Sequence, residues 1–597
     1  MTERTWNLSR VSPRTKILAL LLLVAASLAV LFVDAPAFHP VPDRDSGGFM
    51  YIGQQMLRGQ RLYADLYDDK PPFIFAVNAL GMLISGGSAW GVWLLEACSL
   101  SAAVILGFEV LASAAGLWPA FLAVLAFLGN LLAFLLGGNF TEEYALPFQF
   151  LILFLVLPTG APSRPAWRVF FAGLAWGIVF YFKQNIFGIG VAVGLLIFLR
   201  DLASRRREIL WYAAGFLAMI VGVAAFFWAS GTLWDFWDAT ILSNIAYIGA
   251  ANVHISRTVA IANALKRMLQ SGLFFQSALA LWAVFAQAWL GLGMIALKDR
   301  FRWPGWLGRK RRAWLALLAG GACAGLGIWA RFISSPNLPH RQVLWVSAAL
   351  AGLELGLFGL LHVWPEAGER FKAWVRAAPE NARWLFAAAV LALPLDIFSI
   401  SLSGKGFTHY YLIAYPSAVI LLALGASAAG KLFHQTRWKA AGTLAVSAAM
   451  LLVALLPLRS LPGAYTVARL PQRESVVEYI QSHTHPGDPV LVWGGEPDLL
   501  LLSGTVTPVR FVFMGQPFLS GYATSRFAPE ILEEMKAKPP KLIVDTRECK
   551  IPFVDYKSYA CVPVSGDWQP VFDYIEQNYW LAVRFGSLNW GVYQLVQ

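Results

Sequence analysis

Charged and aromatic side chains that can take part in catalysis recur at the ends of long apolar segments in this sequence. Carboxylates can remove a proton from an attacking hydroxyl group, and lysines or arginines can neutralise a phosphate leaving group. The same carboxylates can hold a divalent metal ion. The candidates are Asp43, Asp45, Asp69, Lys70, Glu142, Glu143, Lys183, Arg331, His340, Arg341, Lys405, His409, Tyr410 and Tyr411.

The acidic candidates also have ordinary structural interpretations. Asp45 or Ser46 can cap the helix that follows. Asp69 can belong, with the lysine after it, to a solvated turn before a proline pair. Glu142 and Glu143 can cap the apolar segment that begins beside them.

The basic candidates are open to a second interpretation as well. Lys183, Lys405 and His409 each lie beside the end of an apolar segment. A long polar side chain in such a place can simply extend to the membrane surface. Their positions in the sequence do not decide between this and a role at a site.

The elements that must position these residues are mostly membrane spans. The chain has 597 residues, of which 58% are hydrophobic and 14% charged, whereas soluble domains carry roughly 25% charged residues. A span needs about 20 mainly apolar residues. We predict 13 spans, near residues 15–33, 89–113, 117–137, 143–158, 167–182, 185–200, 209–229, 273–297, 313–332, 343–362, 384–402, 410–428 and 440–458.

The predicted fold is therefore a polytopic α-helical membrane protein with about 13 transmembrane helices and a C-terminal soluble α/β domain. Residues 1–458 form the transmembrane module and residues 459–597 the soluble domain, in which strands and helices alternate. The expected strands are Pro489–Trp493, Val509–Phe513 and Lys541–Asp545, the helices are Glu474–Ser482, Pro529–Lys538 and Pro570–Asn578, and Leu581–Phe585 and Trp590–Val596 form a terminal hairpin.

The distribution of basic residues predicts the orientation. With the N-terminus inside, the connections on the inner side hold 24 Lys and Arg residues, against 11 in the outer segments before Arg459. Short inner loops of membrane proteins are enriched in this way. The C-terminal domain is then outside. The net charge of +12 reflects these loops, so we expect no nucleic-acid partner.

The N-terminus is basic and then apolar, like a signal peptide, but its apolar run from Ile17 to Val33 is long for one. We expect it to remain as the first span. The apolar stretch Phe73–Ile84 is too short to span, and we expect an interfacial or half-inserted helix. It ends the first outer loop, residues 34–88. A second outer loop covers residues 230–272.

Two cysteines, Cys549 and Cys561, lie in the domain that we expect outside the cytosol, where they can form a disulfide. The sequence has no cysteine and histidine spacing typical of a zinc site, and no P-loop. A glycine pair, Gly494 and Gly495, follows a predicted strand, which is a weak signal for a phosphate site.

The first outer loop resembles that of the GT-C glycosyltransferases. Asp45 and Ser46 precede an amphipathic helix, and Asp69 and Lys70 precede Pro71-Pro72 and an apolar stretch. The aminoarabinose transferases of lipid A and the protein O-mannosyltransferases are similar in this respect. They have an acidic pair at the start of the loop and a basic residue before two prolines at its end. The resemblance covers residues 15–200 in motif order and the rest in topology.

The resemblance implies a role for individual residues. Asp45 matches the catalytic base, while Ser46 replaces the second acid of the pair. Lys70 approaches the donor phosphate, and Asp69 supports it. By the same analogy Lys183, Arg331 and Lys405 bind the donor phosphate, Glu142 or Glu143 is a supporting acid or metal ligand, and Asp43, His409 and Tyr410 are further candidates.

The implied reaction is transfer of a sugar, with inversion, from a polyprenyl-phosphate donor to a glycan, lipid or protein acceptor of the cell envelope. It would take place at the periplasmic face of a bacterial inner membrane, in contact with membrane lipid. Whether the reaction requires a divalent metal ion is left open, and no nucleotide cofactor is expected. Two other functions remain open: a transporter or flippase of a polyprenyl-linked intermediate, and a non-catalytic partner in envelope assembly.

Overall fold

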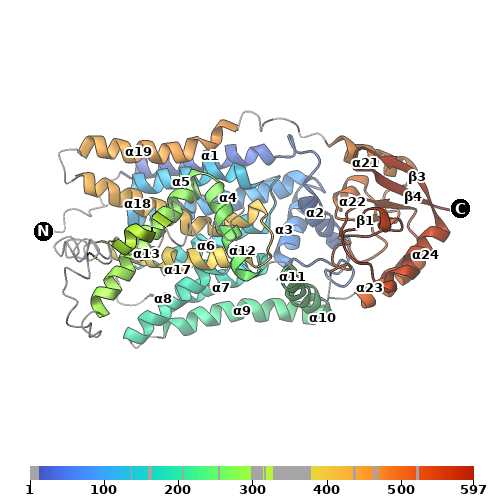
Figure 1. Ribbon diagram of the computed structural model, residues 1–597, viewed down its shortest axis with the longest axis horizontal. Helices are drawn as coiled ribbons and strands as arrows, with labels where there is room; N and C mark the ends of the chain where they lie inside the picture. The colour runs from blue at the N-terminus through green and yellow to red at the C-terminus, as the bar shows by residue number, and fades with distance from the viewer. Residues whose placement is uncertain are drawn as a thin grey trace.

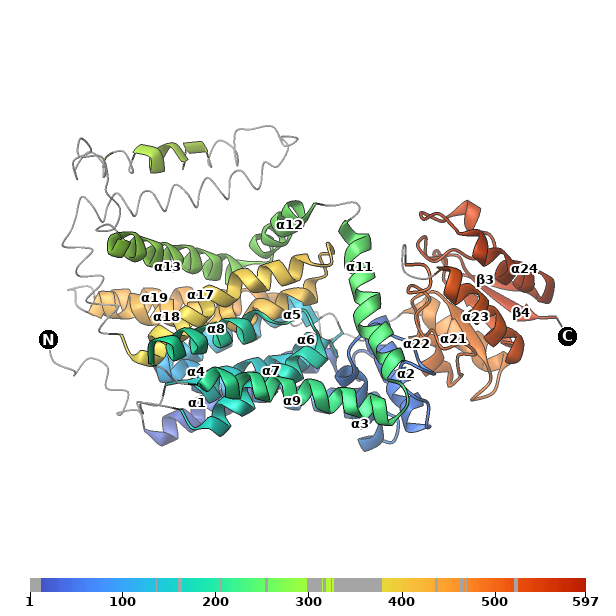
Figure 2. The same ribbon diagram turned by 90° about the horizontal axis from the view of Figure 1, so that it is seen from below.

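The computed structural model of the chain contains a long helical bundle and a smaller C-terminal part with a sheet. Figure 1 shows the helices running along the long axis, with the two chain ends at opposite ends of the molecule. Figure 2 shows the same division from below. The structure describes residues 12–135, 137–158, 164–204, 207–252, 256–297, 314, 318–323, 325–326, 378–434, 439–460, 465, 467, 470–519 and 524–596.

The bundle is that of a multi-pass membrane protein. Among the described residues, six helices are long and apolar enough to cross a membrane, or seven if a bent pair counts as one span. The helices up to the C-terminal part are α1 (Pro13–Leu31), α2 (Arg44–Leu57), α3 (Pro72–Ile84), α4 (Ala89–Ala115), α5 (Leu117–Leu135), α6 (Thr141–Val156), α7 (Ala166–Phe182), α8 (Gly188–Ser204), α9 (Glu208–Ala229), α10 (Leu233–Trp237), α11 (Ser243–Asn252), α12 (Arg257–Gln270), α13 (Leu273–Leu297), α17 (Glu380–Ser401), α18 (Tyr415–His434) and α19 (Lys439–Leu455).

Most of the predicted spans coincide with helices. Of the 13 predicted segments, 343–362 lies outside the described residues and 313–332 lies mostly outside them, while each of the others falls on a helix. Some of these helices are short: α6 has 16 residues and α7 has 17. The total of 13 spans therefore stays a prediction.

Local signals in the sequence set the helix ends. The hydroxyl of Ser88 accepts a hydrogen bond from the backbone N–H of Trp90 at the start of α4, and the helix ends at Gly116, whose φ is 94°. Only glycine adopts such an angle without strain. In α1 the hydroxyl of Ser12 caps the helix and Pro13 occupies its first position, where a missing N–H costs nothing.

The first loop contains the two helices that its sequence predicts. The amphipathic helix is α2, and the short apolar stretch is α3, which has 13 residues. Tyr51 of α2 and Phe75 of α3 are fully buried, because α2 and α3 pack against each other and α3 also packs against α4. Whether α3 lies at a membrane interface stays a prediction.

The second loop folds into helices as well. After α10, residues Asp238–Leu242 form a π-helical turn that leads into α11. Helix α12 then meets α13 at a bend of 119°. The side chain of Asn244 on α11 donates to the backbone carbonyl of Asp69 at 2.7 Å, so the two loops are joined.

The C-terminal part has a four-stranded sheet in the order β1-β2-β4-β3. Strands β1 (Val490–Trp493) and β2 (Leu542–Asp545) are parallel, while β4 (Trp590–Leu595) runs antiparallel to β2 and to β3 (Tyr579–Phe585). Four helices accompany the sheet: α21 (Pro471–His483), α22 (Asp498–Ser503), α23 (Thr524–Ala537) and α24 (Gln569–Asn578).

One predicted strand is wrong. Residues Val509–Phe513 form bends and not a strand of this sheet. Their apolar residues are buried by contact with the first loop instead: the N–H of Tyr67 donates to the carbonyl of Arg510 at 2.7 Å, and Tyr67 forms an isolated bridge with Phe511. The segment thus pairs with the membrane part of the chain, which its local pattern could not indicate.

Helices α7 and α9 cross closely because glycine residues at the crossing lie against the backbone of the opposite helix. A Cβ atom added to Gly215 would lie 1.9 Å from the carbonyl oxygen of Phe170, whereas one added to Gly222, on the same helix, would meet nothing within 4 Å. Small residues let membrane helices approach in this way.

We therefore expect Gly215→Ala to lower stability and Gly222→Ala to leave it unchanged or raise it slightly. Overpacking costs about 1–3 kcal/mol, while alanine is the better helix former by about 1 kcal/mol. The apparent melting temperatures of the two purified variants in one detergent measure the difference. Equal melting temperatures would contradict the close crossing.

Candidate functional site

Most of the candidate residues converge where the bundle meets the C-terminal part. Asp45 lies in the first turn of α2, with a side chain that is 34% exposed and an oxygen 3.8 Å from Nε of Arg44. The N-cap residue is Asp43, whose side chain makes no capping hydrogen bond. The capping interpretation of Asp45 and Ser46 is therefore wrong.

Ser46 points away from Asp45 into a buried polar network. Its hydroxyl lies 3.0 Å from Nδ2 of Asn139, which also donates to Asn78 at 2.9 Å. Tyr144 donates to the amide oxygen of Asn139. Ser46, which replaces the second acid of the GT-C pair, thus helps to pack α2, α3 and α6 together.

Lys70 is held by the acidic residues before it. Its Nζ lies 2.6 Å from Asp69, and its backbone N–H donates to Asp68 at 2.8 Å. Burial lowers the pKa of Lys70, but the charges of Asp69, Asp68 and Asp45 outweigh it and hold the pKa well above its usual value. The side chain of Asp69 is 12% exposed and that of Lys70 is 34% exposed, so the turn considered above is half-buried and not fully solvated.

Lys183 faces inward and not towards a membrane surface. Its Nζ lies 2.5 Å from Oε1 of Glu142 and 3.9 Å from the ring centre of Tyr410, and its side chain is 14% exposed. Glu142 also accepts from the hydroxyl of Thr141. The snorkelling interpretation of Lys183 is therefore wrong.

The two adjacent glutamates have different surroundings. Glu142 pairs with Lys183 and belongs to the group of charges around Asp45. Glu143 is buried, and its carboxyl group faces Glu96 of α4. Geometry thus distinguishes two residues that sequence alone could not separate.

Lys405 and His409 follow α17 and lie on aromatic side chains. The Nζ of Lys405 is 4.2 Å from the ring centre of Tyr247, and the ring of His409 stacks on Phe140 at 4.3 Å. Burial lowers the pKa of Lys405 to about 8, and the charges of Lys550 and Lys70 add to the effect.

Electrostatics connects Asp45 to the residues around it. Burial lowers the pKa of Lys183, and the negative charge of Asp45 acts in the opposite direction. The charge of Asp45 is also among those that raise the pKa of Lys70. Segments that are far apart in the chain therefore place one partly exposed carboxylate among several cations.

Some candidates do not join this group. Arg331, His340 and Arg341 lie outside the described residues. Tyr411 lies beside a cavity of about 350 Å³ that Arg267 also lines. Asp43 is close to the backbone at Gly137, and burial, with the charge of Asp45, raises its pKa.

The described carboxylates do not form a metal site. Within the described ranges, no three His, Cys, Asp or Glu residues lie close enough to hold a metal ion. Asp69 and Glu142 are each paired with a lysine. The requirement for a divalent metal ion therefore stays a prediction.

The C-terminal part also contributes residues to this region, and no motif in the sequence indicated them. Arg44 lies 3.7 Å from Glu548, and Arg473 lies 3.5 Å from the fully buried Asp498. Gly495, from the glycine pair, donates its N–H to Glu548 at 2.8 Å. This N–H is thus already bonded to a carboxylate of the C-terminal part. Gly495 and Glu548 follow the ends of β1 and β2, where polar groups of α/β sheets tend to gather.

Comparisons with known proteins add the following. Residues 3–283, fewer than half of the chain, match the family model described as "Putative competence-induced protein Ccs4 N-terminal domain". No curated protein matches the chain.

Several solved structures are similar to the chain. Oligosaccharyltransferase AglB from Archaeoglobus fulgidus, with an inhibitory peptide and a dolichol-phosphate, is 15% identical, with a TM-score of 0.45 over 98% of this chain and 75% of that one. The same enzyme in the apo form is 13% identical, with a TM-score of 0.47 over 99% of this chain and 75% of that one. ArnT from Cupriavidus metallidurans, bound to undecaprenyl phosphate, is 15% identical, with a TM-score of 0.39 over 96% of this chain and 98% of that one.

All three TM-scores lie below 0.5, so the GT-C resemblance of this chain rests on its own first-loop motifs.

We expect the buried ion pair between Lys183 and Glu142 to stabilise the fold. Removing one partner of a buried ion pair costs about 3–5 kcal/mol, because it leaves the other charge uncompensated. We expect Lys183→Met to lower the melting temperature strongly, and Lys183→Met with Glu142→Gln to recover most of the loss. Thermal unfolding of the single and double variants measures this coupling. Additive losses would show that the two side chains do not interact.

Proposed function

We propose that the protein is an inverting glycosyltransferase that moves a sugar from a polyprenyl-phosphate donor to a cell-envelope acceptor. The observation that carries the proposal is the position of Asp45, which is 34% exposed and acts electrostatically on Lys70 and Lys183. Lys405 is near enough to Lys70 and Asp69 to interact with both. A base and a set of cations are the two parts that such a reaction needs. The superfamily resemblance of the first loop points the same way.

The proposed chemistry uses these residues directly. An acceptor hydroxyl attacks the anomeric carbon of the sugar, and Asp45 takes the hydroxyl proton. The bond between the anomeric carbon and the phosphate oxygen breaks, and its electron pair leaves with polyprenyl phosphate. Lys70, Lys183 and Lys405 neutralise the negative charge that develops on this leaving group.

The surroundings of Asp45 suit the role of base. It is the exposed carboxylate of the group, whereas Asp69 and Glu142 are occupied by their lysine partners.

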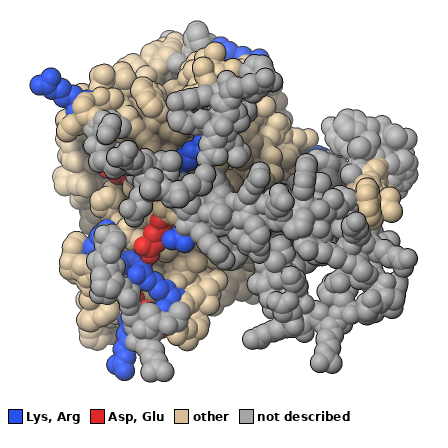
Figure 3. Space-filling model, turned by 90° about the vertical axis from the view of Figure 1, so that its left-hand side faces the viewer, with Lys and Arg blue, Asp and Glu red and all other residues tan. Residues whose placement is uncertain are grey.

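The proposal includes the topology that the sequence predicts. Residues 1–458 form a module of about 13 spans with the N-terminus in the cytoplasm, and residues 459–597 lie at the periplasmic or extracellular face. Lys and Arg side chains gather at several points of the bundle end opposite the sheet, as the described part of Figure 3 shows. That distribution is typical of a cytoplasmic face, which supports an outer position for Asp45.

Transfer of label from radiolabelled polyprenyl-phosphate sugars tests the proposal. We expect membranes with the wild-type protein to label an acceptor, and Asp45→Asn to reduce the rate about 10²–10⁴-fold, as loss of a general base does. Asp65→Asn is the matched control, since Asp65 lies in the same loop but pairs with the exposed Arg61. A fully active Asp45→Asn variant would refute the assigned base.

A broad donor panel that gives no label with wild type would favour transport instead. The bend of 119° between α12 and α13 suits a transporter, since transporters use broken helices. Movement of a polyprenyl-linked sugar across liposomes by the purified protein, without transfer, would establish that alternative.

The pKa of Lys405 predicts how donor binding depends on pH. The pKa is lowered to about 8, so Lys405 carries its charge below this pH and loses it above. The phosphodiester of the donor does not titrate in this range. We expect the donor KM to rise as pH increases from 7 to 9, and to stay flat in Lys405→Arg, because arginine remains charged. The same rise in both proteins would assign the effect to another group.

A further inference from the structure

A cavity of about 350 Å³ lies where three parts of the bundle meet. These parts are the end of α5, the bend between α12 and α13, and the joining segment, residues 402–414, which connects α17 to α18. In Figure 2, α12 lies towards the end of the bundle that faces the C-terminal part. The lining residues are Ala133, Phe134, Arg267, Gln270, Ser271, Gly406, Thr408 and Tyr411.

The cavity lies beside the end of a membrane span. Helix α5 is long and apolar enough to cross a membrane. Ala133 and Phe134 belong to its last turn, since the helix ends at Leu135. The phosphate groups of lipids lie at the ends of the spans, just beyond the apolar core of the bilayer. A ligand in the cavity would therefore be at the depth of lipid phosphates.

Arg267 gives the cavity a positive charge. It is exposed, and it forms no ion pair with any residue that the structure describes. No Asp or Glu is among the lining residues. A guanidinium group with free N–H donors, in a cavity without carboxylates, favours an anion. Phosphate suits it well, because two N–H groups of arginine match two phosphate oxygens.

Gly406 provides the space that the guanidinium group of Arg267 occupies. A Cβ atom added to Gly406 would overlap Nη1 and Cζ of Arg267. The φ angle of Gly406 is outside the left-handed region, so the backbone does not require glycine at this position. The missing side chain instead lets Arg267 lie against the joining segment at the cavity.

Tyr411 contributes a hydroxyl group without a partner. The residue is 2% exposed, and its ring packs on Phe134 and Phe275, with centroids 6.2 Å apart in each pair. Its hydroxyl makes no hydrogen bond within the described part of the chain, although buried polar groups are nearly always bonded. Leaving such a group unpaired destabilises a fold. The hydroxyl therefore points to an acceptor that binds in the cavity.

The joining segment separates the cavity from the cations assigned to the donor phosphate. Gly406 and Tyr411 line the cavity. Lys405 and His409, from the same segment, instead lie on aromatic rings of α11 and of the residue before α6. An anion in the cavity is therefore distinct from the donor phosphate.

We propose that the cavity binds the phosphate group of a bilayer phospholipid, with Arg267 supplying the charge and Tyr411 a hydrogen bond. Ala133 and Phe134 are suited to the apolar part of the lipid next to its headgroup. A bound lipid would hold the joining segment and, with it, Lys405. The inference does not depend on the proposed function, because it concerns binding and not transfer.

Binding of dioleoylphosphatidylglycerol to the purified protein in detergent tests the proposal, with native mass spectrometry measuring the affinity. We expect Arg267→Gln to weaken binding about tenfold, as loss of one charge-assisted contact does. Lys266→Gln is the matched control and should bind as wild type does, since Lys266 is on the same helix but does not line the cavity. Equal affinities of wild type and Arg267→Gln would overturn the proposal.

Tyr411→Phe separates binding from folding. Because the hydroxyl has no partner in the described part of the chain, its removal should leave the melting temperature of the lipid-free protein unchanged or raise it. The same change should weaken lipid binding about fivefold, as loss of one hydrogen bond does. A lower melting temperature with unchanged lipid binding would show a structural role only and would overturn the assignment of Tyr411.

Gly406→Ala tests the position of the guanidinium group while leaving every charge in place. The added Cβ atom must displace Arg267, so we expect lipid binding to weaken as it does in Arg267→Gln. Binding as tight as that of wild type would contradict the need for glycine at this position.

Two competitors distinguish the sources of the anion. Inorganic phosphate or undecaprenyl phosphate is added to wild-type protein with bound phosphatidylglycerol, at a concentration equal to that of the lipid. We expect phosphatidylglycerol to remain bound. Displacement by inorganic phosphate would assign the cavity to a free anion, and displacement by undecaprenyl phosphate would assign it to the donor lipid. Either result would overturn the assignment to a bilayer phospholipid.

Discussion

Charge placed at the end of an apolar helix bundle must be paired, and this constraint organises the region around Asp45. An uncompensated charge away from water costs several kcal/mol. Lys183 therefore reaches Glu142 across α6 and α7, and Lys70 reaches Asp69 within the first loop. These pairs fix the ends of the helices that carry them, and they leave Asp45 as the carboxylate with the most freedom to act.

The C-terminal part docks on both loops through arginines. Arg510 lies over the rings of Tyr67 and Phe527 and contacts Glu530, and Arg526 forms a two-pronged contact with the buried Asp238. Because arginine can bond a carboxylate with two N–H groups and also stack on aromatic rings, two residues connect three segments of the chain. The edge of the sheet is thereby held over α2, where its charges act on those of the membrane part.

This docking has consequences for chemistry at a membrane surface. Lys183 follows α7 of the bundle and is 14% exposed, whereas the side chains of Asp45 and Lys70 in the first loop are each 34% exposed. In the proposed reaction, a lipid-linked phosphate reaches the cations from the membrane side and a soluble hydroxyl reaches the carboxylate from the water side. The proposed reaction needs both approaches, because the leaving group stays in the membrane whereas the acceptor belongs to the envelope.

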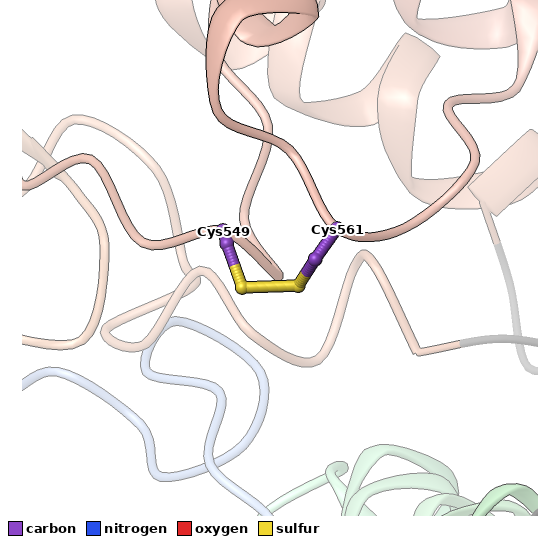
Figure 4. Close-up of a disulfide and its surroundings, with 2 residues drawn as sticks. All are labelled: Cys549 and Cys561. Atoms are coloured by element: carbon purple, nitrogen blue, oxygen red, sulfur yellow. A yellow bond between two sulfur atoms is a disulfide. The ribbon is translucent and has the colours of Figure 1, made fainter.

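The sequence by itself determined the elements and the first-loop residues. Apolar runs fixed the helices, since a membrane span must satisfy its backbone hydrogen bonds internally. The spacing of Asp45, Asp69 and Lys70 pointed to chemistry, and the two cysteines of the C-terminal part are the pair that the structure joins (Figure 4). These signals are local, so they could be read without knowing the fold.

Only the tertiary structure decided which charges meet. It separated Glu142 from Glu143, turned Lys183 inward, placed Ser46 in a buried network and left Val509–Phe513 outside the sheet. It also brought Glu548 to Arg44 of α2, from about 500 residues along the chain. Such pairings depend on electrostatic and packing energies between distant segments, and no local pattern of residues encodes them.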